Sequence, residues 1–157
     1  MSGGLRLTRQ SSLLAMLTAD FYRYVSWMMN DLDLTEHRDF IEGLISKHIE
    51  ARLELVESRN EMDDRIGRAI WGSEVSSPLI QLPKCITAEE IDQSLIALAV
   101  RGQVTNTPKL VEHADEINTE IAYLEHLVLH EIAHIKNDWH QDRETDCDLW
   151  VYEQMHG

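Results

Sequence analysis

The sequence predicts a mainly α-helical domain, of the α+β kind with at most a small edge strand or sheet. Apolar residues recur at three- and four-residue steps along most of the chain, which is the spacing of one helix face. Only residues 76–83 look extended, because they are an apolar segment with prolines near both ends. The length of 157 residues, with 43% apolar and 27% charged residues, indicates one globular domain over residues 1–157.

The first half of the chain is predicted to contain two long helices and the extended segment. Apolar periodicity places the first helix over about residues 8–30. A second begins near Thr35 and continues, less regularly after residue 56, to a stop at Gly72, a residue that readily adopts the left-handed cap conformation. Pro78 and Pro83 favour an edge strand or a linker over a central strand for the segment between them.

The next predicted helix covers about residues 88–101. Thr87 and Glu90 have the spacing of a capping box, in which each side chain bonds to the backbone N–H of the other residue. Gly102 is the expected end of this helix.

The last part of the chain is predicted to form two helices joined by a short turn. Pro108 suits a first helical position, and the pattern runs from there to about residue 136, with a possible new start at Asn118. A final helix covers about residues 142–155, with Asp142 as its expected N-cap.

The charge of the chain argues against nucleic acid as a partner. The formal net charge is −14, from 14 basic and 28 acidic side chains, and the basic residues are scattered singly. No apolar run approaches the roughly 20 residues of a membrane span. The two cysteines, Cys85 and Cys147, read as reduced thiols, so a cytoplasmic protein with neither membrane nor nucleic-acid partner is expected.

The most informative segment has the pattern HExxH at residues 130–134. On a helix, His130 and His134 are four residues apart and project from one face, so their imidazoles can bind one Zn²⁺ ion. Glu131 points about 100° away from His130, where its carboxylate can take a proton from a metal-bound water. A shuffled chain with the same 8 histidines would contain the pattern roughly 0.04 times.

Two residues compete as the third metal ligand. Glu144 begins a Glu-x-x-Cys-Asp pattern, and a turn before Glu144 could fold the last helix back toward the histidines. Asp148, one helical turn later, would then accept a hydrogen bond from a ligand imidazole. His140 is the alternative third ligand, because HExxH followed by a histidine six residues on is the metzincin spacing. Cys147 is interpreted as a small buried apolar residue rather than a ligand.

At residues 120–155 the chain resembles HExxH zincin metallopeptidases of the gluzincin type. The pattern HEIAHIKN followed by Glu-x-x-Cys-Asp is similar to that of HtpX- and BlaR-type peptidases, and to the phage-related ImmA/IrrE- and Lit-type peptidases. The resemblance implies a zincin-like active-site helix, a short turn and a ligand-bearing helix, with His130, His134 and Glu144 as ligands and Glu131 as base. It also implies an edge strand that holds the peptide, for which residues 79–82 are the candidate.

The sequence therefore predicts a zinc-dependent hydrolase that cleaves a peptide bond, with a peptide or a narrow protein target as substrate. Tyr123, Tyr152 and His140 are candidates for assisting the oxyanion, and nothing in the sequence selects among them. Two other functions stay open. The chain could be a catalytically inactive, zinc-stabilised protein-interaction module, or a metal-dependent hydrolase of a non-peptide amide. The sequence does not predict the oligomeric state.

Overall fold

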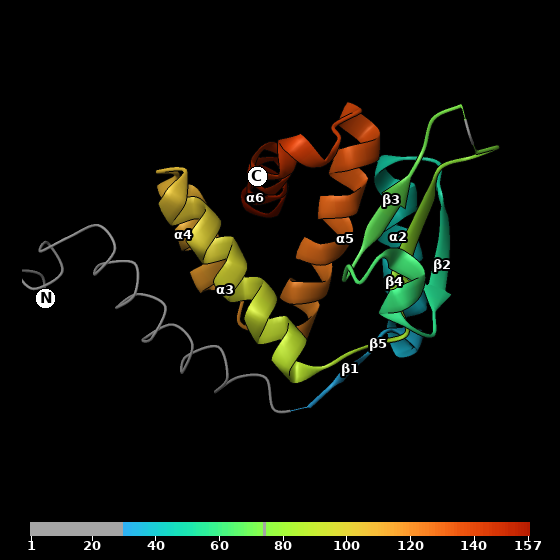
Figure 1. Cartoon of the computed structure of the whole chain (residues 1–157), viewed down its shortest axis with the longest axis horizontal. Helices are drawn as coiled ribbons and strands as arrows, with labels where there is room; N and C mark the ends of the chain where they lie inside the picture. Colours follow the sequence, from blue (N-terminus) through green and yellow to red (C-terminus); the bar gives the residue numbers. More distant parts are fainter. Residues whose placement is uncertain (1–29, 74) are drawn as a thin grey trace, which may run out of the picture.

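The computed structural model describes residues 30–73 and 75–157 (Figure 1). The helix expected over about residues 8–30 lies outside the described residues. Within the described ranges, five α-helices accompany one two-stranded and one three-stranded sheet, so the expected mainly α fold class is confirmed. No helix in this part of the chain is long and apolar enough to cross a membrane.

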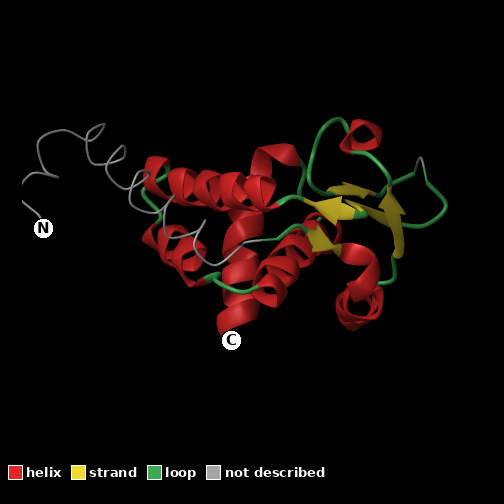
Figure 2. Cartoon of the chain, turned by 90° about the horizontal axis from the view of Figure 1, so that it is seen from below, coloured by secondary structure: helices red, strands yellow, loops and turns green. Residues whose placement is uncertain are grey.

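The larger sheet consists of β2 (Arg52–Val56), β4 (Leu79–Pro83) and β3 (Arg68–Ile70), in the order β2-β4-β3. Strand β4 is parallel to β2 and antiparallel to β3. The smaller sheet pairs β1 (Leu32–Asp33) with β5 (Cys85–Ile86) in antiparallel fashion. In Figure 2 the strands gather at one end of the molecule and most of the helices at the other.

The predicted long helix from Thr35 to about residue 70 is wrong. After the short 3-10 helix η2 (Leu34–His37), α2 covers only Arg38–His48, and β2, the 3-10 helix η3 (Arg59–Met62) and β3 follow. In β2 more buried side chains alternate with exposed ones over the first four residues, which is strand periodicity. A run this short fits either period, and its pairing with β4 decides in favour of a strand.

The extended segment is a strand, as expected, but it is the central strand rather than an edge. The reason lies in the positions of its two prolines. Pro78 precedes β4 and Pro83 is its last residue, so neither removes a backbone donor from the strand interior. The edge positions belong to β2 and β3.

Helix α3 (Ala88–Val104) begins with the expected capping box between Thr87 and Glu90 but runs two residues past Gly102. Gly102 serves close packing instead of ending the helix. A Cβ at this position would lie 2.8 Å from Cβ of Leu110 and 2.9 Å from the backbone nitrogen of Val111. Its missing side chain therefore lets α3 approach α4 (Pro108–Glu116) closely.

The last helices are α5 (Glu120–Asn137) and α6 (Glu144–His156). Thr119, next to the expected Asn118, caps α5 by accepting a hydrogen bond from the Ala122 backbone. Asp142 is not an N-cap, since it lies within the 3-10 helix η4 (Gln141–Arg143) that leads into α6. Figure 1 shows α5 between α6 and α3 on one side and the strands and α2 on the other, so the motif helix runs through the core.

Candidate metal centre

The candidate centre is built by α5, one sharp turn and α6. His130, Glu131 and His134 lie on α5, whose hydrophobic positions pack into the core around them. The chain reverses at Asp138, which has the left-handed φ of 53°, and the Trp139 backbone N–H donates to the His134 carbonyl oxygen. This closed turn returns α6 alongside α5 and brings Glu144 and Asp148 to the histidines.

Each motif histidine is held through Nδ1, which leaves Nε2 facing Glu144. Nδ1 of His130 donates to Oδ1 of Asp148 at 2.8 Å, and Nδ1 of His134 donates to the Trp139 carbonyl oxygen at 2.5 Å. Fixing Nδ1 in this way is the usual arrangement for an imidazole that binds metal through Nε2. The expected role of Asp148 in orienting a histidine therefore has its hydrogen bond in the structure.

Glu144 bridges the two free nitrogens. Its Oε2 is 2.7 Å from Nε2 of His130 and its Oε1 is 3.3 Å from Nε2 of His134. Ligands about 2.0–2.2 Å from a tetrahedral Zn²⁺ are roughly 3.4 Å apart, which is close to the 3.3 Å between Oε1 of Glu144 and Nε2 of His134 and longer than the 2.7 Å between Oε2 and Nε2 of His130. Two imidazoles and one carboxylate are a donor set that could hold a zinc ion with one position left for water or substrate.

The ionisation of these groups is coupled. Burial alone would lower the pKa of His130, but the carboxylates of Asp148 and Glu144 outweigh it and hold that pKa well above its usual range. Burial alone would raise the pKa of Glu144, but its hydrogen bonds to His130 and His134 outweigh burial and lower that pKa. A cation bound between Nε2 of His130 and Glu144 would compete with a proton for the same position.

Glu131 lies beside this cluster, with only 6% of the residue exposed. Burial raises its pKa above the ordinary value for a glutamate, although the two histidines oppose the shift. A raised pKa brings a carboxylate closer to the operating pH, as a general base requires. The backbone at Gly67 covers this side chain, because a Cβ there would meet Oε2 of Glu131 at 2.9 Å.

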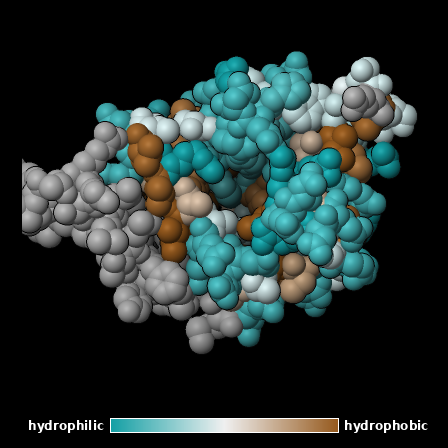
Figure 3. Space-filling model, viewed as in Figure 1, coloured by the Kyte–Doolittle hydropathy of each residue, from teal (hydrophilic) through white to brown (hydrophobic). Residues whose placement is uncertain are grey.

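Two cavities meet at the cluster. The larger, about 470 Å³, is lined by the three HExxH residues, Glu144 and Asp148 and by side chains of α3. The second, about 280 Å³, is lined by Glu131 and His134 and by β3 with Trp71. Figure 3, viewed in the same direction as Figure 1, shows a mainly hydrophilic surface with a hollow near its middle.

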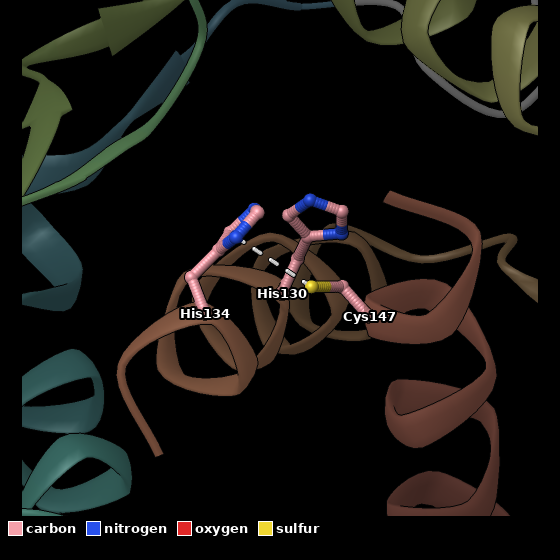
Figure 4. A group of neighbouring side chains, drawn as sticks. All are labelled: His130, His134 and Cys147. Carbon is pink, nitrogen blue, oxygen red and sulfur yellow. Dashed lines mark hydrogen bonds between the residues drawn. The ribbon is translucent and has the colours of Figure 1, made fainter. Parts of the chain in front are cut away.

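Cys147 lies closer to the histidines than expected. It is fully buried, as expected, but its Sγ is 3.6 Å from Nδ1 of His134, and one ligand atom from each of His130, His134 and Cys147 lies within 4.8 Å of the others (Figure 4). It is a weaker third donor than Glu144. Burial and the surrounding carboxylates raise the pKa of its thiol to about 12, and it approaches the nitrogen already bonded to Trp139.

His140, the alternative third ligand, is not brought to the two Nε2 atoms. Its side chain is 72% exposed and stacks on Trp71, with ring centroids 4.9 Å apart. Its position suits the wall of the second cavity rather than the cation site. Among the oxyanion candidates, Tyr123 lines the larger cavity and bonds to Ser94, whereas Tyr152 bonds to Glu112 on α4.

Sequence reasoning missed three contributors to the centre: Gly67, the Trp139 carbonyl and Arg101, whose guanidinium pairs with Asp148 on the side opposite His130. A glycine before a strand, a backbone carbonyl and a single arginine carry no motif, so the sequence holds no signal for them. Comparisons of the chain with protein-family models, curated proteins and solved structures find no match.

Proposed function

We propose that the chain is a zinc-dependent peptidase of the HExxH type, similar to the gluzincins, with His130, His134 and Glu144 as ligands. The observation that carries the proposal is the position of Glu144 against both Nε2 atoms, beside the buried carboxylate of Glu131. A structural zinc site fills its positions with protein donors and has no use for a buried carboxylate next to it.

When bound, Zn²⁺ supplies Lewis acidity that polarises a carbonyl and lowers the pKa of a water. Glu131 would take the proton from the attacking water and later give it to the leaving amine nitrogen. Its raised pKa suits both steps, because the group must accept and release the proton near neutral pH. Asp148 and the Trp139 carbonyl keep the two imidazoles in the orientation that presents Nε2.

A peptide substrate is supported by the edge strand β3. Its other edge is unpaired within the described part of the sheet, and β3 lines the second cavity together with Glu131 and His134. An extended peptide added to β3 would bond through its backbone and reach the catalytic carboxylate. This assigns the substrate-holding role to residues 68–70, in place of the central strand segment at residues 79–82.

The exchange Glu131→Gln tests the proposal, since Gln keeps the shape and cannot accept the proton. The purified full chain, loaded with zinc, is incubated with a library of natural peptides, and cleavage products are identified by mass spectrometry. We expect the wild type and a Glu125→Gln control on the same helix to cleave, and Glu131→Gln to bind zinc without cleaving. Equal cleavage by Glu131→Gln would remove Glu131 as the base.

The alternatives make different predictions in the same experiment. A zinc-stabilised interaction module would bind the metal and cleave no peptide, and a non-peptide amidase would cleave only small amides. A narrow protein target in the cytoplasm, as the phage-related resemblance implies, would show as a few cleaved sites that share a sequence. Both cysteines are free thiols, in keeping with a reducing compartment.

A further inference from the structure

A second group of metal-binding side chains lies between α4 and α6. His113 and Glu116 are three residues apart on α4, and His156 is the last residue of α6. One ligand atom from each of the three lies within 4.8 Å of the others. None of the three belongs to the HExxH cluster, and the sequence analysis assigned them no role.

Both histidines are held so that each offers one ring nitrogen to this group. Nδ1 of His156 donates to the Tyr152 backbone carbonyl at 2.8 Å, so Nε2 is the nitrogen that faces Glu116. Nε2 of His156 lies 2.5 Å from Oε1 of Glu116. This repeats the pattern of the first cluster, where a backbone carbonyl fixes Nδ1 of a histidine and a carboxylate faces Nε2.

His113 supplies an independent observation, because its free nitrogen is buried. The residue is only 1% exposed, and its Nε2 bonds to Nδ1 of His126 at 3.0 Å. Its Nδ1 is buried and has no hydrogen-bond partner among the described residues. An unpaired buried nitrogen is costly, and a cation bound to it would remove that cost. Since Nε2 is engaged by His126, Nδ1 is the atom left to bind one.

The charges of the group also suit a cation. Burial lowers the pKa of His113 to about 4, so its imidazole is neutral near pH 7 and keeps a lone pair for metal. Glu116 supplies the negative charge of the group, whereas Glu112, one helical turn earlier on α4, accepts a hydrogen bond from Tyr152 and is not one of the three ligands. The donor set is two imidazoles and one carboxylate, which favours Zn²⁺, Co²⁺, Ni²⁺ or Cu²⁺ over Mg²⁺ or Ca²⁺.

We propose that His113, Glu116 and His156 form a second binding site for a divalent transition-metal ion, which joins the end of α6 to α4. The site is separate from the proposed catalytic centre and does not depend on it. Three protein ligands leave a position for water, and the two ligand residues with large exposed fractions, Glu116 and His156, make the site accessible from solvent. Bound metal would stabilise the packing of α6 on α4.

The test counts metal ions on the full chain. Protein stripped with a chelator is titrated with Zn²⁺ alone in competition with a coloured chelator, for the wild type, His156→Ala and Glu116→Gln. Glu112→Gln is the matched control, because it removes a carboxylate from the same helix without touching the proposed ligands. We expect two ions on the wild type and on Glu112→Gln, and a loss of affinity on the order of 100-fold for one ion in the other two variants.

Titrating His134→Ala as well distinguishes the two sites. If the second site exists, His134→Ala retains one ion, and adding Zn²⁺ raises its thermal midpoint. The double variant with His134→Ala and His156→Ala should show no such rise. If only the second ion were found, in wild type and His134→Ala alike, the second site would stand and the catalytic proposal would fall. An unchanged number of ions and unchanged affinities in His156→Ala and Glu116→Gln would overturn the second site.

Discussion

The third ligand offers the sharpest test of the catalytic centre. Glu144 contacts both Nε2 atoms, whereas His140 is 72% exposed and stacked on Trp71. Structural zinc sites with four ligands bind with about 10–16 kcal/mol, or about 2.5–4 kcal/mol for each ligand. Glu144→Ala is therefore expected to weaken zinc binding by about 100-fold or more, and His140→Ala by less than about twofold.

Proton competition opposes part of this loss. Glu144 raises the pKa of His130 and His134, so protons compete with zinc for these nitrogens in the wild type. Removing the carboxylate lowers those pKa values toward their ordinary range and relaxes the competition. The difference between Glu144→Ala and the wild type should consequently grow as the pH rises through the raised pKa values of the two histidines, because the competing protons leave there.

The assay is competition with a coloured zinc chelator at pH 6 and pH 8, with thermal unfolding to verify that each variant is folded. Asp148→Ala belongs in the same series, because losing the bond to Nδ1 of His130 should cost about 10- to 100-fold in zinc affinity. Loss of zinc by His140→Ala, with Glu144→Ala at wild-type affinity, would refute the gluzincin-like ligand set and favour the metzincin-like one.

Four further substitutions test the surroundings of the centre and the core. Gly67→Ala should push the carboxylate of Glu131 by a few tenths of an ångström, so we expect about tenfold lower turnover with unchanged zinc content. Gly102→Ala places its Cβ against the α4 backbone and should cost about 1–3 kcal/mol, or roughly 2–4 °C in thermal midpoint for each kcal/mol. Gly43→Ala on α2 meets no atom within 4 Å and should instead stabilise, so a loss of stability there would contradict the packing argument. Burial raises the pKa of Asp92, whose Oδ1 is unpaired among the described residues. The folded wild type therefore loses stability as the pH rises from 3.8 through the raised pKa of Asp92. Asp92→Asn should melt at a higher temperature than the wild type at pH 7, and the difference between their thermal midpoints should vanish below pH 3.8.

The helical half of the fold was predictable because its signals are local. The capping box at Thr87, Pro108 at the first position of α4 and the periodicity of α5 each act within one or two helical turns. The strands around residues 49–70 were not predictable, since a strand of five residues leaves too short a pattern to exclude a helix. There β2 exists because β4 lies beside it, and β4 lies more than twenty residues further along the chain.

In the candidate site, too, the local features could be predicted from the sequence and the distant contacts could not. The HExxH spacing by itself places His130 and His134 on one helix face, because four residues complete about one turn. The sequence also singled out Glu144 and Asp148, but it left His140 open, since the path of a nine-residue connection depends on the turn at Asp138. Their roles as ligands and as an orienting group stay predictions until zinc binding is measured.

What the sequence by itself determined is therefore a set of local features: the helical fold class, the capping box at Thr87 and the spacing of the motif histidines. Only the tertiary structure decided which distant groups meet these features. It placed the backbone of Gly67 over Glu131, the edge strand β3 beside His134, and His156 next to Glu116, forty residues away. The physical reason is that hydrogen bonds within a helix join neighbours along the chain, whereas strand pairing and helix packing are settled by the shape and chemistry of the whole core.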